Sequence, residues 1–223
     1  MEISACDPGL PETIGLARLF AIGFSGSDYS AIITELLARL ETAKGDAAAL
    51  FDLGTILMLN GKRQEGLDCQ KDALRLSRQF RQPATGTAEA PVRLLMLAAP
   101  GDFMANTPVQ FLLEGAGTTL DTHYLSPDGE LPDLVPPHDV LLVGIGESDE
   151  SAPILKSLQP ALADWPRPVL NKPAEVLKLA REKLAATVGP GRGLDVPVTV
   201  RIAREKLDDL ANEKARPADL LGE

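Results

Sequence analysis

The sequence has few of the residues that cross-link a protein or bind metal ions. Its two cysteines, Cys6 and Cys69, are far apart and lack the spacing of metal ligands, so neither a disulfide framework nor a zinc site is supported. The two histidines, His123 and His138, have no cysteine or second histidine at ligand spacing, and we expect no metal site. This use of cysteine fits a reducing compartment, and we expect a cytoplasmic protein.

Aromatic residues and basic clusters are also scarce. Aromatic residues make up 4% of the chain, and the formal net charge is −10. No basic cluster alternates with aromatic residues as it would in a groove for a phosphate backbone, so we expect no nucleic-acid partner. No apolar run approaches the roughly 20 residues that span a bilayer, and no membrane or export signal is predicted. Hydrophobic residues make up 44% of the chain, enough for two small cores.

Residues 11–80 have the apolar spacing of four consecutive helices. Apolar residues recur there every three or four positions, which is the period of an amphipathic helix. The period breaks where glycine or asparagine can end a helix, at Gly23, at Gly45 and at Asn60-Gly61. The pattern predicts two helical hairpins, with the fourth helix over about residues 63–80.

The third and fourth of these helices resemble one tetratricopeptide repeat (TPR). Residues of suitable size stand near the positions that this repeat requires: Leu50, Leu53, Gly54, Leu57, Gly66 and Ala73. The usual aromatic positions hold Leu57 and Gln70, and only one copy is present where stable arrays need about three. Two interpretations stay open: an ordinary four-helix cap, or a repeat that binds a protein or peptide partner.

From residue 91 onwards, short apolar runs alternate with helical segments. Strands are expected near 92–97, 120–125 and 140–143, and the first and third runs are as apolar as parallel strands covered on both faces. The sequence predicts an α/β class, with a small doubly wound, mainly parallel sheet domain preceded by an all-α, TPR-like domain. The expected divisions are a helical domain at 1–82, a linker at 83–90, an α/β domain with connector at 91–201, and a C-terminal helix and tail at 202–223.

Two polar loops are expected at one edge of this sheet. Ligands of open α/β sheets bind beyond the carboxyl ends of the strands, where the loops Ala98–Thr107 and Gly144–Glu150 should be neighbours. The first loop precedes a helix, whose N-terminus favours an anion, and the carboxylates of the second could bind an amine. Helix capping and turns use the same residue types, so both roles stay open. The candidate substrate-binding residues are Gly101, Asp102, Asn106, Thr107, Glu147, Ser148 and Asp149.

The segment 165–200 carries a resemblance to a known family. A short apolar run ends there at Asn171, a helical pattern begins at Pro173, and the extended run D-V-P-V-T-V follows. This order resembles the connector that leads into the nucleotide-binding core of ATP-grasp ligases. Residues 91–171 resemble the domain that precedes that core, and the helical region resembles the TPR-like extension of some bacterial ATP-grasp proteins.

The resemblance implies a carboxylate-amine ligase that uses ATP and magnesium. In the family, a lysine of the connector approaches the ATP phosphates, and Lys183 matches it here, which makes Lys183 the expected cofactor-binding residue unless it is a plain surface lysine. The glycine-rich loop and magnesium-binding carboxylates of the core do not follow Val200. We therefore expect ATP and magnesium to bind only in a longer chain, and no cofactor or catalytic residue in this one, whether it is a cut chain or a natural remnant.

Two functions stay open at this point. As the N-terminal part of an ATP-grasp ligase-like protein, the chain would supply one wall of the substrate site and a helical region that recruits the substrate. As a non-catalytic interaction module, its helical region would bind a partner and its α/β domain would be a scaffold. The substrate and the partner are not predicted.

Overall fold

A computed structural model describes residues 2–3, 9–89, 91–189, 193, 196–197 and 199–221. The chain forms two compact units, Met1–Pro173 and Ala174–Glu223. The helices of the larger unit are α1 (Leu16–Phe24), α2 (Ser30–Thr42), α3 (Ala47–Leu59), α4 (Arg63–Leu76), α5 (Gln110–Leu113) and α6 (Ala152–Leu162). Its strands are β1 (Glu2–Ile3), β2 (Gln79–Gln82), β3 (Arg93–Ala98), β4 (Thr119–Tyr124), β5 (Leu134–Val135), β6 (Val140–Val143) and β7 (Val169–Leu170).

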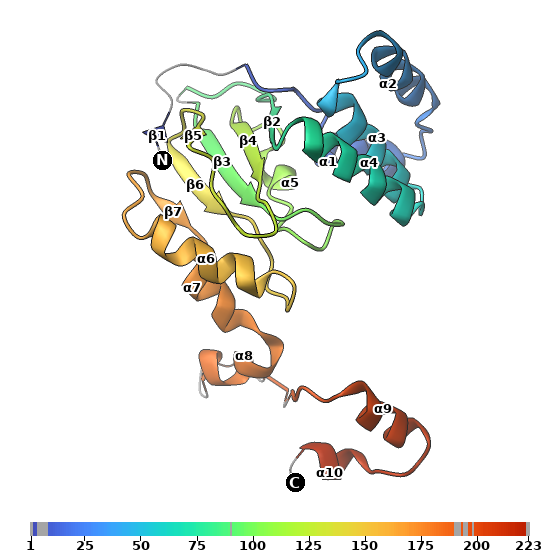
Figure 1. Cartoon of the computed structure of the whole chain (residues 1–223), viewed down its shortest axis with the longest axis vertical. Helices are drawn as coiled ribbons and strands as arrows, with labels where there is room; N and C mark the ends of the chain where they lie inside the picture. Colours follow the sequence, from blue (N-terminus) through green and yellow to red (C-terminus); the bar gives the residue numbers. More distant parts are fainter. Residues whose placement is uncertain are drawn as a thin grey trace. The chain divides into compact units, whose positions relative to one another are not determined.

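Five strands of the larger unit form one sheet in the order β2-β4-β3-β6-β7 (Figure 1). β3, β4, β6 and β7 run parallel, with Met96 of β3 opposite Thr122 on one side and Leu142 on the other. β2 pairs antiparallel with β4, so the sheet is mixed but mostly parallel, and the predicted α/β class with a mainly parallel sheet is confirmed. The chain runs from β3 to β4 and then crosses to β6 on the other side of β3. This order places a topological switch point between β3 and β6.

The central strands are buried on both faces, which explains their continuous apolar runs. Residues 94–98 of β3 and 141–143 of β6 are all buried. On one face, side chains of β3, β4 and β6 pack together with Leu113 of α5. A strand with two covered faces needs apolar residues at every position rather than at alternate ones.

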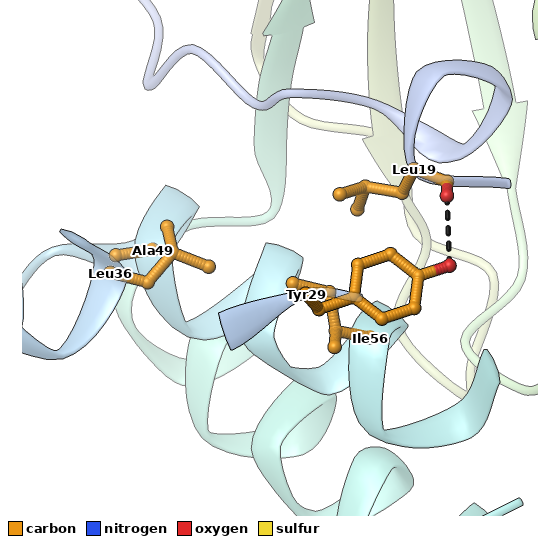
Figure 2. Close-up of a cluster of buried hydrophobic side chains, with 5 residues drawn as sticks. All are labelled: Leu19, Tyr29, Leu36, Ala49 and Ile56. Atoms are coloured by element: carbon orange, nitrogen blue, oxygen red, sulfur yellow. Dashed lines mark hydrogen bonds between the residues drawn. The ribbon is translucent and has the colours of Figure 1, made fainter. Parts of the chain in front are cut away.

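The helices α1, α2 and α3 share a core of their own (Figure 2). Tyr29, at the start of α2, donates a hydrogen bond from its hydroxyl to the backbone oxygen of Leu19 in α1 at 2.9 Å. α3 begins where the Asp46 carboxylate accepts a hydrogen bond from the Ala49 N–H. The buried members of the core are Leu19, Tyr29, Leu36, Ala49 and Ile56.

α3 and α4 approach each other closely at two glycines. A Cβ added at Gly66 would lie 2.6 Å from the backbone oxygen of Gly54, and one added at Gly54 would lie 2.8 Å from that of Gly66. Neither position has room for a side chain. This close contact agrees with both interpretations of the hairpin, the TPR-like repeat and the ordinary helical cap.

Gly66→Ala is therefore expected to destabilise the protein by about 1–3 kcal/mol, although alanine favours helix, because a backbone oxygen has to move. Urea unfolding measures the change. Gly45→Ala is the matched control, since Gly45 is exposed and an added Cβ there meets nothing within 4 Å. We expect its effect to stay within about 0.5 kcal/mol. Equal effects of the two substitutions would contradict the close contact of α3 and α4.

The structure corrects the predicted end of the fourth helix. α4 ends at Leu76, and Gln79–Gln82 form β2 at the edge of the sheet. Phe80 of β2 is 3% exposed and packs against α3 and α4, so its burial outweighs the local helical pattern. Because β2 joins α4 directly to the sheet, the helices and the sheet belong to one compact unit, and the expected linker at 83–90 does not divide two units.

The chain from Pro173 onwards forms short helices. They are α7 (Pro173–Val176), the 3₁₀ helix η1 (Leu177–Leu179), α8 (Arg181–Val188), α9 (Arg204–Ala211) and α10 (Pro217–Leu221). The single helix predicted from Pro173 is broken, because Ala180 has extended backbone angles, φ −52° and ψ 132°. The extended run predicted at Pro197 and Thr199 forms no strand at the described positions there, and Val198 lies outside the described residues. Of the helices that the structure describes, none is both long and apolar enough to cross a membrane.

Candidate functional site

The two predicted loops meet at the carboxyl edge of the sheet. Asn106 of the first loop and Ile145 of the second form an isolated antiparallel bridge. The Thr107 N–H donates a hydrogen bond to the Gly144 oxygen at 2.6 Å. The prediction that these loops are neighbours is confirmed, and they lie at the switch point between β3 and β6.

Contacts within the larger unit fix the first loop in place. The Asn106 side-chain amide donates to the Ala99 oxygen and accepts from the Ala99 N–H, each at 2.8 Å. The Gln70 side chain of α4 bonds in the same way to the backbone N–H and oxygen of Gly101, each at 2.9 Å. Asn106 and Gly101 thus have structural partners, and the loop is fastened to the helical region.

Asp102 and Ser148 also have partners. The Asp102 carboxylate lies 2.7 Å from the Arg63 guanidinium of α4, and this contact holds the pKa of Asp102 below its ordinary value. The Ser148 hydroxyl accepts from the Ser151 N–H at 3.1 Å, while the Ser148 N–H donates to the Ser151 hydroxyl at 2.9 Å. Glu147 and Asp149 flank Ser148 in this loop, which leads into α6.

A cavity of about 80 Å³ lies between the helices and the sheet, beside the first loop. Gly101, Asp102, Asn106 and Thr107 line it together with residues of α3, α4, β2 and β4. Glu147, Ser148 and Asp149 lie outside its lining. The structure therefore brings four of the predicted site residues to one cavity and leaves the three of the second loop apart from it.

Asp52 of α3 is the most buried charged residue at this cavity, with 1% of its surface exposed. Its carboxylate accepts hydrogen bonds from the Ile14 N–H at 2.8 Å and the Gly15 N–H at 3.5 Å. Gly15 has φ 91°, and an added Cβ would lie 2.5 Å from the Gln82 side chain, so only glycine fits. Burial raises the pKa of Asp52 to about 6, although the two N–H groups act in the opposite direction.

Aromatic side chains line the same cavity, although the chain has only six Phe and two Tyr. The ring centroid of Phe51 lies 4.8 Å from that of Phe80 and 5.1 Å from that of Tyr124. Phe103, in the first loop, also contributes to the lining. Desolvation and the nearby Asp52 carboxylate raise the pKa of the Tyr124 hydroxyl, which therefore stays neutral at physiological pH.

Asp52 and these aromatic residues were not predicted from the sequence. A signal for Asp52 was present, because it is the only charged residue of α3, whose sequence is AAALFDLGTILML. A carboxylate in so apolar a helix is drawn into the core and needs a partner there. Phe51, Phe80 and Tyr124 gave no such signal, since they come from distant segments that only the fold brings together.

Lys183 belongs to the smaller unit, whereas the cavity is formed by the larger unit alone. Lys183 lies in the first turn of α8 with an exposed side chain, because a new helix begins after the extended backbone at Ala180. Within the described residues, no group of three or more His, Cys, Asp and Glu lies close enough together to hold a metal ion.

No protein-family model matches the sequence, and no curated protein or solved structure is significantly similar to it.

Proposed function

We propose that this chain is the N-terminal part of an ATP-grasp carboxylate-amine ligase-like protein, and that its cavity forms part of the substrate site. The observation that carries the proposal is the place of the cavity. It lies over one face of a mostly parallel sheet and reaches the carboxyl edge, where α/β proteins bind ligands, and both the loop 98–107 and the helical region line it. The reaction class comes from the sequence resemblance of residues 91–200.

Each part of the chain has a role under this proposal. The first loop supplies one wall of the substrate site, and the TPR-like helical region closes the opposite wall. Lys183 offsets the phosphate charge of ATP when a nucleotide-binding core is present. ATP and magnesium supply the phosphoryl activation of a carboxylate, which needs more positive charge than one lysine provides. The protein acts in the cytoplasm.

The 223-residue chain is expected to hydrolyse no ATP above background with magnesium present. Its nucleotide affinity should be no tighter than about millimolar, since a few exposed polar contacts yield only a few kcal/mol. In a longer protein that contains an ATP-grasp core, Lys183→Ala should weaken ATP binding by about tenfold through the loss of one charge-assisted contact. Calorimetry with Mg-ATP measures both affinities.

Lys178→Ala is the matched control in the longer protein. Lys178 lies in the same unit and pairs with Glu175 at 2.7 Å, so its loss removes one positive charge close to the same position. We expect it to bind ATP normally. Micromolar ATP binding by the 223-residue chain would contradict the expectation that ATP binds only when the nucleotide-binding core is present. In the longer protein, full activity of Lys183→Ala would contradict the proposed role of Lys183.

The alternative function, a non-catalytic TPR-like interaction module, is favoured by a different surface. A groove of about 840 Å³ lies between the α1–α2 turn and the end of α3. At its edge, Phe24 is 85% exposed and its ring stacks on that of Phe20 at a centroid distance of 6.0 Å. Exposed aromatic residues of this kind are found where an apolar segment of a partner binds. Under this alternative function, even a longer form of the protein would show no ATP-dependent activity.

A further inference from the structure

We propose that the cavity beside Asp52 binds the alkylammonium end of a small amine, with Asp52 as its counter-ion and aromatic rings as its wall. The inference rests on the proposed function only in treating the cavity as part of a substrate site. The chemistry of the ligand is inferred from side chains of the larger unit, and four features of the cavity support it.

The first feature is that two acceptors at the cavity, the Gln110 side-chain oxygen and the Asp52 carboxylate, have capacity for further hydrogen bonds. The side-chain amides of Gln70 and Asn106 each donate one hydrogen bond to a backbone oxygen and accept one from a backbone N–H. The Thr55 hydroxyl donates to a backbone oxygen of its own helix. In contrast, the side-chain oxygen of Gln110 is buried without a hydrogen-bond partner among the described residues. From the part of the chain that the structure describes, Asp52 accepts hydrogen bonds from two backbone N–H groups, one of them at the long distance of 3.5 Å. A ligand with several N–H donors would satisfy both residues.

The second feature is a buried carboxylate without a counter-ion. No lysine or arginine among the described residues forms an ion pair with Asp52, whereas Asp102, the other carboxylate at the cavity, is paired with Arg63 at 2.7 Å. A calcium ion takes about six to eight oxygen ligands, far more than one free carboxylate offers. A monovalent organic cation matches this charge better.

The third feature is the aromatic wall. Phe51, Phe80 and Tyr124 form one cluster with ring centroids 4.8, 5.1 and 6.2 Å apart. An ammonium group within about 6 Å of a ring centroid is attracted by the negative face of the ring. The same rings offer apolar surface to methylene groups. The wall therefore favours an ammonium group on an alkyl stem over a hydrated inorganic cation.

The fourth feature is size. At about 80 Å³, the cavity has roughly half the volume of a cavity of about 150 Å³ that holds benzene. It therefore has room for about three or four non-hydrogen atoms. A ligand of this size is n-propylammonium, and a larger amine would insert only its ammonium end.

The test is an NMR titration of the isotope-labelled 223-residue chain with n-propylammonium chloride. We expect saturable shifts of the Ile14 and Gly15 amide signals, because these N–H groups donate to Asp52. The Kd should be about millimolar, since ligands of so few atoms rarely bind more tightly. n-Propanol, the neutral probe of the same shape, should bind at least about tenfold more weakly, and so should propylammonium to Asp52→Asn. Sodium chloride at equal ionic strength is the salt control.

Asp68→Asn is the matched control, because it removes an exposed carboxylate of α4 outside the cavity and should leave the Kd unchanged. Gln110→Leu is a second variant that removes the other unused acceptor and should weaken binding about three- to tenfold. No saturation, equal binding of propanol, or full binding by both cavity variants would overturn the proposal. No nucleotide is present, so this result and the ATP result can each fail without the other.

Discussion

Arg81→Met is expected to destabilise the larger unit by about 3–5 kcal/mol, because it leaves the Asp121 carboxylate buried without its partner. The Arg81 guanidinium of β2 bonds both carboxylate oxygens of Asp121 on β4, at 2.7 and 2.8 Å. Only 14% of the Arg81 side chain and 3% of the Asp121 side chain are exposed. Water therefore cannot replace the lost contact. Urea unfolding measures the loss.

Two further variants make this prediction specific to the buried pair. The double replacement of Arg81 by Met and Asp121 by Leu should recover most of the lost stability, since it removes the unpaired charge as well. Arg93→Met is the matched control: Arg93 and Asp139 are 3.9 Å apart, and about half of each side chain is exposed. Its effect should stay within about 1 kcal/mol. A loss no greater for Arg81→Met than for Arg93→Met would show that the Arg81–Asp121 pair is not buried in solution.

Asp52→Asn is expected to change the pH dependence of stability by about 3 kcal/mol in total. The folded protein raises the pKa of Asp52 from 3.8 to about 6, so it binds this proton more tightly than the unfolded chain does. The stability that Asp52 contributes is thus fully present below about pH 4 and is lost as the pH rises through about 6. Asparagine cannot titrate, and its side-chain oxygen can still accept from the Ile14 N–H.

The measurement is the difference in unfolding free energy between Asp52→Asn and the unchanged protein at several pH values. We expect this difference to move in favour of the variant by about 3 kcal/mol between about pH 3 and pH 7. Carboxylates with a lowered pKa, such as Asp46 and Asp102, titrate in both proteins and cancel in the difference. A difference that stays constant with pH would mean that Asp52 is solvated. A stability cost at neutral pH is common for side chains kept for function.

The sequence predicted those elements whose pattern depends only on local burial. β3 and β6 were predicted because a strand covered on both faces has to be apolar throughout. α3 was predicted because its apolar period is helical and Asn60-Gly61 can end it. β2 was missed because its sequence, QFRQ, is mostly polar. Its arginine pairs with the buried Asp121 of β4, a partner that no local pattern indicates.

The candidate site was predicted in position but not in composition. The rule for the carboxyl ends of parallel strands gave the correct edge of the sheet and the contact between the two loops. It did not show that two residues of the first loop already have partners in α4: Gly101 hydrogen-bonds to Gln70, and Asp102 forms an ion pair with Arg63. It also did not indicate Asp52, because the wall opposite the sheet is made by helices that the sequence analysis assigned to another domain.

The pairing of β2 with β4 has a consequence for the chain as it is synthesised. Gln79 pairs with His123, so all of α1 to α4 leaves the ribosome before the partner of β2 has been made. Until then Phe51 and Phe80 lack the cover that Tyr124 gives them. Nascent chains with uncovered apolar surface and an unpaired strand edge are prone to aggregate and to bind chaperones. The helical region, although it comes first, can complete its folding only after β4 has emerged.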